Sequence, residues 1–190
     1  TQFSLTFGPD WTTTPTQQAK LQASNGVAND EFGDWEMVAI SGDGAYAIVG
    51  AEKTGTNRGT AYIYVRSGST WSQQQILHAP SPTAQDYFGG SGCIDASGTY
   101  AGVGSWGEDK FYIYIRSGSK WSLQQEIAGP YRVSSGYSDY FGKHCCITPD
   151  GTRLCVGAAL NPTGGTNKGA VYVYSRSGTT WSQEAFLQAS

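Results

Sequence analysis

Two histidines and four cysteines are the most reactive side chains in this 190-residue sequence. His144 directly precedes Cys145, and an imidazole next to a thiol suggests a nucleophile with its base. The surrounding residues predict a strand, however, and neighbouring residues of a strand point to opposite faces. No Gly-x-Ser-x-Gly turn precedes a predicted helix either. We therefore expect no catalytic residue and no enzymatic activity.

Three aspartates at matching positions form a second candidate, an array of carboxylates. Asp30, Asp86 and Asp139 each stand two residues before a Phe-Gly pair. An aspartate at such a turn accepts hydrogen bonds from nearby backbone N–H groups, so we expect a structural role. A Gly-x-Gly-x-x-Gly string begins at Gly102, but a predicted strand rather than a helix follows it. We therefore expect no nucleotide cofactor.

The elements that must position these residues repeat three times. Phe-Gly pairs occur at residues 32–33, 88–89 and 141–142. Each pair begins a strand, a glycine turn and a second strand that ends in Val-Gly. A third strand of alternating residues, such as Ala-Tyr-Ile-Tyr-Val-Arg, and a fourth that begins near Trp-Ser complete the unit. Both faces of the third strand are bulky, which indicates a sheet covered on both sides.

Four-stranded units of roughly 50 residues are typical of β-propeller blades. We predict an all-β fold, a β-propeller of four-stranded antiparallel blades at residues 25–79, 80–128 and 129–190. Residues 1–24 match the second half of the same pattern and predict a half blade of two outer strands with its linker. A half blade leaves an unpaired sheet edge. Either the protein continues beyond this chain, or copies of the chain complete one another.

Composition excludes several classes of function. Charged residues make up 14% of the chain, and the net charge is −3. Nucleic-acid binding requires a basic surface, so we do not expect it. No apolar run approaches the roughly 20 residues that span a bilayer, and no signal peptide opens the sequence. We expect no membrane insertion.

The four cysteines leave two interpretations open. A turn near residues 149–152 would place Cys146 opposite Cys155, within reach of a cross-strand disulfide. Cys145 would face the other way, toward Cys93 of the preceding unit. We expect either the pairs Cys146–Cys155 and Cys93–Cys145, or four buried thiols that pack as small apolar side chains. The absence of a Cys-x-x-Cys pair argues against zinc.

Aromatic residues that interrupt the repeat are the candidates for ligand binding. They are Trp35, Trp106, Tyr131 and Tyr137. Exposed aromatic rings among amides and hydroxyls suit sugars, which stack on the ring and form hydrogen bonds at its edge. The alternative is that these rings fill gaps between blades, as expected for Trp71 and its equivalents.

The motif Asp-x-Phe-Gly, followed by a strand, an Asp-Gly turn and Val-Gly-Ala, resembles the FG-GAP repeat. That repeat builds the propeller of integrin alpha chains and occurs in bacterial and algal surface proteins. Residues 16–33, Thr-Gln-Gln-Ala-Lys-Leu-Gln-Ala-Ser-Asn-Gly-Val-Ala-Asn-Asp-Glu-Phe-Gly, are most similar to the surface proteins. The resemblance covers nearly the whole chain and implies a propeller fold, an extracellular or cell-surface location and an adhesion or scaffold role.

The resemblance does not extend to the family's calcium loops. Calcium-binding members have several Asp and Asn residues in the turn between strands one and two, and Ca²⁺ takes six to eight oxygen ligands. The matching turns here contain one acidic residue each, namely Asp43, Asp95 and Asp150. We therefore expect no metal site.

These observations together favour a non-enzymatic extracellular scaffold or adhesion protein. Its expected partners are adjoining repeats or copies of itself, in a fibre, a coat or a larger propeller. The alternative is a lectin-like module that binds glycans through its loop aromatics. A hydrolase with a site in the propeller channel is the third hypothesis, and fold alone does not choose among the three.

Overall fold

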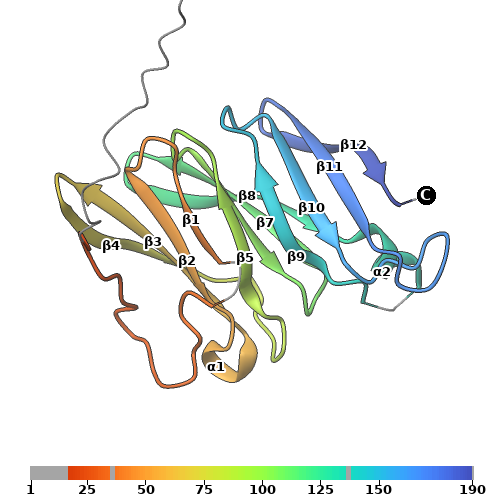
Figure 1. Ribbon diagram of the computed structural model, residues 1–190, viewed down its shortest axis with the longest axis horizontal. Helices are drawn as coiled ribbons and strands as arrows, with labels where there is room; N and C mark the ends of the chain where they lie inside the picture. Colours follow the sequence, from red (N-terminus) through yellow and green to blue (C-terminus); the bar gives the residue numbers. More distant parts are fainter. Residues whose placement is uncertain (1–16, 35–36, 136–137, 190) are drawn as a thin grey trace, which may run out of the picture.

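The computed structural model of the chain describes residues 17–34, 37–135 and 138–189. Within these ranges the chain forms three separate four-stranded sheets, each an antiparallel meander in sequence order. The sheets lie side by side in chain order (Figure 1). The predicted all-β architecture of propeller blades is thereby confirmed.

Each blade contains four strands. Blade 1 consists of β1 (Val38–Ile40), β2 (Tyr46–Ala51), β3 (Thr60–Ser67) and β4 (Thr70–Leu77). Blade 2 consists of β5 (Phe88–Ile94), β6 (Tyr100–Ser105), β7 (Lys110–Ser117) and β8 (Lys120–Ala128). Blade 3 consists of β9 (Phe141–Ile147), β10 (Arg153–Ala158), β11 (Ala170–Ser177) and β12 (Thr180–Leu187). Strands β5 and β9 begin at their Phe-Gly pairs as expected, whereas β1 begins at Val38, after Phe32-Gly33 and the residues that follow it. Two short helical segments lie in loops, α1 (Thr54–Asn57) and α2 (Pro130–Ser135).

The turn between the third and fourth strands has the same chemistry in all three blades. Its glycine has a positive φ of 61° at Gly68, 60° at Gly118 and 60° at Gly178, a conformation that glycine adopts without strain. The arginine two residues earlier reaches the turn between strands one and two; for example, Arg176 Nε donates to the Gly151 carbonyl at 2.9 Å. The two turns at this end of each blade are therefore tied together.

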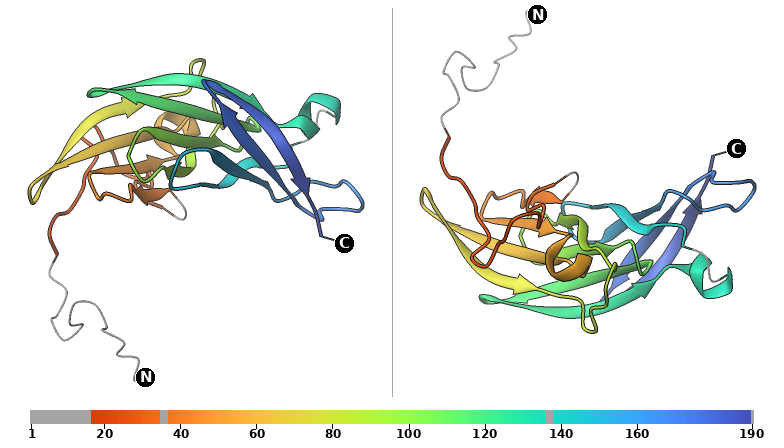
Figure 2. Two further views of the ribbon diagram at one scale, coloured as in Figure 1. Left: turned by 90° about the horizontal axis from the view of Figure 1, so that it is seen from above. Right: turned by 90° about the horizontal axis from the view of Figure 1, so that it is seen from below.

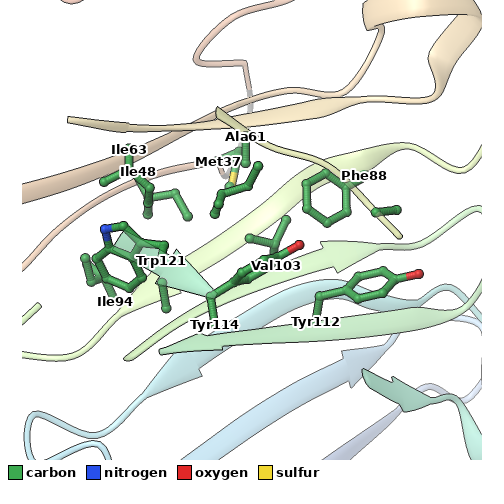
Figure 3. Packing of buried hydrophobic residues seen from close by; sticks show 13 residues of the cluster. Met37, Ile48, Ala61, Ile63, Phe88, Ile94, Val103, Tyr112, Tyr114 and Trp121 are labelled. Atoms are coloured by element: carbon green, nitrogen blue, oxygen red, sulfur yellow. The ribbon is translucent and has the colours of Figure 1, made fainter. Parts of the chain in front are cut away.

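Hydrophobic layers hold adjacent blades together. Between blades 1 and 2, Ile48 and Ile63 of blade 1 belong to one buried cluster with Ile94 and Trp121 of blade 2 (Figure 3). A second layer of the same kind joins blades 2 and 3. We call the side of a blade that faces the preceding blade its rear face, and the opposite side its front face. Seen from above and below, blade 1 (orange and yellow) and blade 3 (blue) lie at the two ends of the row (Figure 2).

The first strands of the blades converge, which explains the Val-Gly motif at the end of each second strand. Strand β5 contacts β1 and β2, and β9 contacts β5 and β6. A Cβ atom at Gly104 would lie 1.8 Å from the carbonyl oxygen of Gly142 in blade 3. Only glycine allows this close approach of two backbones.

A glutamine clamp repeats at both blade interfaces. On the front face of blade 1, Gln75 donates to the Trp121 carbonyl and accepts from the Trp121 N–H, both at 2.8 Å. Gln125 forms the same pair of hydrogen bonds with Trp181 of blade 3, at 2.9 and 2.8 Å. The front face of one blade thus recognises the rear face of the next through backbone as well as apolar contacts.

Only the last part of the predicted half blade can be compared with the structure. In its described part, residues 17–24, no strand is formed. This segment instead lies against the rear face of blade 1, where Leu21 and Ala23 pack on a cluster that includes Tyr62 and Tyr64. Residues 1–16 lie outside the described residues.

No described helix is both long and apolar enough to cross a membrane.

Candidate functional site

Trp106 lies where the three blades meet, directly after β6. Its indole ring stacks on Tyr87 of the same blade, with ring centroids 4.1 Å apart and planes inclined by 11°. Its Nε1 donates a hydrogen bond of 2.9 Å to Glu52 Oε2 of blade 1. The Lys143 ammonium of blade 3 lies 5.2 Å from the ring centroid. All three blades therefore contact this one residue.

The contacts of Trp106 decide what its ring can offer a ligand. Tyr87 covers one face of the ring, so the Lys143 ammonium must approach the other. Tyr140 adds an edge contact at 5.2 Å between centroids. A sugar would have to displace Lys143 in order to stack on this ring. This contact pattern is that of a residue that fills a gap between blades, one of the two roles expected for it.

A pocket of about 330 Å³ opens beside Trp106. Glu31, Asp34 and Glu52 of the first repeat form one wall, and Lys143 and His144 of blade 3 form another.

Two carboxylates that line this pocket have partners within the chain. The Glu31 carboxylate pairs with Lys53 Nζ at 2.5 Å, and Glu52 accepts from Trp106. Within the described ranges, no group of three or more His, Cys, Asp or Glu residues is placed to hold a metal ion. The pocket is therefore a mixed-charge recess suited to a small polar group.

His144 and Cys145 diverge, as expected for neighbours on a strand. His144 lines the pocket, whereas Cys145 packs against the hydrophobic layer between blades 2 and 3. The structure therefore does not bring these two side chains together as nucleophile and base.

In each of the two expected pairs the cysteines are neighbours in the structure, without a disulfide bond. Cys146 and Cys155 are direct partners across β9 and β10. A hydrogen bond with Cys145, together with burial, raises the pKa of the Cys93 thiol. Burial and the neighbouring Cys146 raise the pKa of Cys155. All four are free thiols in this structure, so disulfide formation stays a prediction. The alternative of four buried thiols is wrong, because only Cys93 is buried, whereas Cys145 and Cys155 are half-buried and Cys146 is exposed at the strand surface.

The aspartates that precede Phe-Gly are buried in turns. Asp30 Oδ2 accepts from the Val27 N–H at 2.7 Å. Asp86 accepts from both the N–H and the hydroxyl of Thr83. Asp139 Oδ2 accepts from Asn161 Nδ2 at 2.6 Å. Asp30 and Asp86 thus close the turns that lead toward a first strand. Asp139 accepts from the Phe141 N–H at 3.2 Å and also links its turn to the loop after β10, and the three carboxylates do not form one site.

The acidic residues of the turns between strands one and two also serve their own turns. Asp43 accepts from the Ser41 hydroxyl and the Ala45 N–H, and these bonds lower its pKa. Bonds from Thr148 and Thr152 lower the pKa of Asp150 to about 2. These carboxylate oxygens accept hydrogen bonds within their own hairpin turns.

Asp109 is a notable buried residue that sequence reasoning missed. It is 1% exposed and has a φ of 53°, at the position where the other repeats have Gly59 and Gly169. Its Oδ1 accepts from the Ser138 hydroxyl at 2.8 Å and the Phe141 N–H at 3.2 Å.

The second oxygen of Asp109 is less well satisfied. Asp109 Oδ2 forms no hydrogen bond, and the Arg132 guanidinium lies 3.6 Å away. Burial raises the pKa of this carboxyl. An Asp in place of glycine before the third strand was the signal available in the sequence. Through its hydrogen bonds with Ser138 and Phe141, the Asp109 side chain links the short loop after β6 to blade 3.

Large apolar side chains are exposed on the outer sides of the end blades. On the rear face of blade 1, Val38 is 62% and Ile40 is 59% exposed, whereas Ile94, which is equivalent to Ile40 in blade 2, is 8% exposed. On the front face of blade 3, Val171 is 37% and Leu187 is 54% exposed.

The inner blades show how these positions are normally used. The pair Val171–Leu187 corresponds to Ala61–Leu77 in blade 1 and to Phe111–Ile127 in blade 2. Those four side chains are 0%, 3%, 0% and 8% exposed, because the next blade covers them. The exposed end faces therefore have the composition of blade interfaces.

Tyr131, the other aromatic candidate among the described residues, does not line the pocket beside Trp106. Tyr131 lies in α2, in the linker between blades 2 and 3, and is half-buried. Trp35 and Tyr137 lie outside the described residues.

Sequence comparison identifies the repeat. Residues 15–64 match the FG-GAP repeat family. A comparison with curated proteins finds no match.

Solved structures similar to this chain share its fold at low sequence identity. One is the β-propeller domain of Cps50 (Swd1) from Myceliophteria thermophila, with a TM-score of 0.50, 11% identity, and coverage of 80% of this chain and 42% of that one. A hypothetical selenium-binding protein from Sulfolobus tokodaii has a TM-score of 0.56, 12% identity, and coverage of 80% and 40%. A provisional 6-phosphogluconolactonase from Bacteroides fragilis has a TM-score of 0.56, 11% identity, and coverage of 81% and 41%.

The chain thus spans less than half the length of these proteins, and the likeness at this identity concerns the fold alone. Together with the family match, it shows that residues 15–64 are an FG-GAP repeat and that the chain is built of β-propeller blades.

Proposed function

We propose that this chain is a non-enzymatic extracellular scaffold or adhesion module that packs its end blades against further blades. The observation that carries this proposal is the exposure of interface-type side chains on both end faces. Leu187 is 54% exposed, whereas the equivalent Leu77 is 3% exposed.

The free energy available from covering these faces supports association. Burial of one Val, Leu or Ile side chain stabilises by about 1.5–3 kcal/mol. Val38 and Ile40 point to the same side of β1, and Val171 and Leu187 are direct partners, so each face presents a contiguous pair. Contiguous exposed apolar side chains of this kind mark interaction surfaces.

The arrangement of the polar groups favours a structural role over catalysis. The carboxylates of the Trp106 pocket contact a lysine and the indole nitrogen, and the turn carboxylates bond within their turns. The proposed extracellular location rests on the FG-GAP repeat.

Sedimentation velocity over a range of concentrations tests the proposal. We expect the 20.3 kDa chain to associate as its concentration rises. Ile40→Glu places a charge on the rear face of blade 1 and is expected to weaken association. Leu123→Glu is the matched control, because Leu123 is 40% exposed but lies on the middle blade. A monomer at every concentration, or equal effects of both variants, would contradict association through the end faces.

Glycan binding is the alternative that the Trp106 pocket keeps open. A ligand there would meet the edge of the indole ring and the charged groups around it, rather than a free ring face. A glycan array compared between the natural chain and Trp106→Ala tests this, and loss of a reproducible signal in the variant would favour the lectin hypothesis.

A further inference from the structure

One six-residue pattern occurs twice in the chain. Residues 19–24 read Ala-Lys-Leu-Gln-Ala-Ser, and residues 185–190 read Ala-Phe-Leu-Gln-Ala-Ser. The first occurrence lies against the rear face of blade 1, and the second begins at the end of β12 in blade 3. The corresponding stretches after the fourth strands of blades 1 and 2, Leu-His-Ala-Pro and Ile-Ala-Gly-Pro, are different.

The first occurrence is held by specific contacts. Leu21 and Ala23 pack against the apolar cluster on the rear face of blade 1. The Tyr64 hydroxyl donates to the Gln22 carbonyl at 2.7 Å. Gln73 exchanges two hydrogen bonds with Ser24, at 3.0 and 2.9 Å. This place therefore recognises a backbone carbonyl, a serine and two apolar side chains.

The same contact marks where a blade receives the linker of the blade before it. In blade 2, the Tyr114 hydroxyl donates to the His78 carbonyl at 3.0 Å, and His78 directly follows β4. Gln22 therefore occupies on blade 1 the place that His78 occupies on blade 2. The rear face of blade 1 is thus arranged to accept the end of a fourth strand.

The second occurrence ends a fourth strand and has no comparable cover. Leu187 is 54% exposed, and Ala189 is exposed as well. Gln188 donates from its side chain to the Gly169 carbonyl at 3.3 Å. Because Leu187 and Ala189 match Leu21 and Ala23, the same apolar contacts are chemically available to them.

We propose that Leu187–Ala189 of one copy replaces Leu21–Ala23 on blade 1 of a second copy. This exchange joins copies head to tail and brings the front face of blade 3 against the exposed Val38 and Ile40. The inference rests on the proposed function, since it names a second copy of this chain as the structure that covers the end faces.

The proposed contact between copies lacks the glutamine clamp of the internal blade interfaces. Gln75 and Gln125 clamp the tryptophan of the next blade, but the equivalent residue of β12 is Ala185. The resident segment also has an alanine at this place, Ala19. The exchanged contact lacks two hydrogen bonds of the internal interfaces, so it is weaker than they are.

Two substitutions with opposite effects test the exchange. Leu187→Glu removes an apolar contact of the incoming segment and is expected to weaken association at least tenfold in sedimentation equilibrium. Leu21→Glu loosens the resident segment and is expected to strengthen association several-fold. Leu123→Glu is the control for added charge. Weaker association of Leu21→Glu with an unchanged unfolding transition would overturn the exchange.

A variant that adds a contact between copies tests the same proposal without disrupting one. Ala185→Gln installs the missing clamp opposite Trp71 of the second copy, and we expect association about tenfold tighter. Unchanged association in Ala185→Gln would overturn the predicted register of the contact.

Cross-linking identifies the partner directly. A photoreactive benzoylphenylalanine at position 188, in a mixture of ¹⁵N-labelled and unlabelled chains, is expected to link to residues 60–73 of the differently labelled copy. Links within one copy only would overturn the proposal.

The variants also separate this proposal from the proposed function. If the natural chain associates and Ile40→Glu weakens the association while Leu187→Glu does not, the exchange is wrong and the proposed function stands. If the natural chain is monomeric, the proposed function itself fails.

Discussion

Equivalent tyrosines of blades 2 and 3 are predicted to respond oppositely to removal of one hydroxyl. Tyr114 and Tyr174 are each 4% exposed and each packs edge-on against a phenylalanine at 6.5 Å. The Tyr114 hydroxyl donates to the His78 carbonyl, whereas the Tyr174 hydroxyl is buried without a hydrogen-bond partner. The acceptor equivalent to His78 for Tyr174 would be the carbonyl of Ala128. Ala128 is still part of β8, where it pairs with Lys110 in the sheet of blade 2, whereas His78 lies beyond the end of β4.

The expected magnitudes follow from these contacts. Tyr114→Phe removes a hydrogen bond and leaves the His78 carbonyl without this donor, so the free energy of unfolding should fall by about 1–2 kcal/mol. Tyr174→Phe removes a buried hydroxyl that lacks a partner, so the free energy of unfolding should rise by about 1 kcal/mol. For a chain of this size, each kcal/mol shifts the melting temperature by about 2–4 °C.

Urea unfolding followed by tryptophan fluorescence measures both variants. The measurement is made at a concentration where the chain is monomeric, and equal m-values would show that the surface exposed on unfolding is unchanged. Equal destabilisation by the two variants would refute the reasoning, because it would mean that the Tyr174 hydroxyl has a partner of its own.

Three further predictions concern the contacts between and within blades. Gln125→Ala removes both hydrogen bonds to the Trp181 backbone and should lower the free energy of unfolding by about 1–3 kcal/mol in urea, without changing the far-UV circular dichroism. Burial raises the pKa of Asp109 above its unfolded value, so the free energy of unfolding should fall as pH rises from about 4 through that raised pKa. In thermal melts, Asp109→Asn should reduce this fall. An unchanged pH profile in the variant would exclude Asp109 as its source. We propose that mild oxidation links Cys146 to Cys155. After denaturation and alkylation, mass spectrometry should then find two alkylated thiols, or none if Cys93 and Cys145 are linked as well. Four alkylated thiols would contradict the pairing.

Much of the fold could be predicted from local sequence. The strand alternation, the glycine turns and the Trp-Ser step define four strands per unit, because each depends on side-chain direction or backbone conformation over a few residues. The opposite faces of His144 and Cys145 follow from the strand period alone. The pairing of Cys146 with Cys155 follows from the length of one hairpin, since register is set by the turn.

The candidate site was harder to predict because its parts come from three repeats. Trp106 was noticed as an interruption of the pattern, but its contacts with Glu52 and Lys143 depend on how blades 1 and 3 lie beside blade 2. Asp109 was not singled out, although it replaces a glycine found in both other repeats. Its partners, Ser138 and Phe141, belong to the next blade and are about 30 residues away.

The sequence by itself determined the repeat and the blade, since these depend on contacts within one unit. Only the tertiary structure decided which apolar residues are covered. Leu77 and Leu187 end equivalent strands, yet one is buried and the other exposed, because burial depends on whether a neighbouring blade lies against that face. A repeat pattern specifies the face, and the position of the repeat in the row decides what remains for a partner to cover.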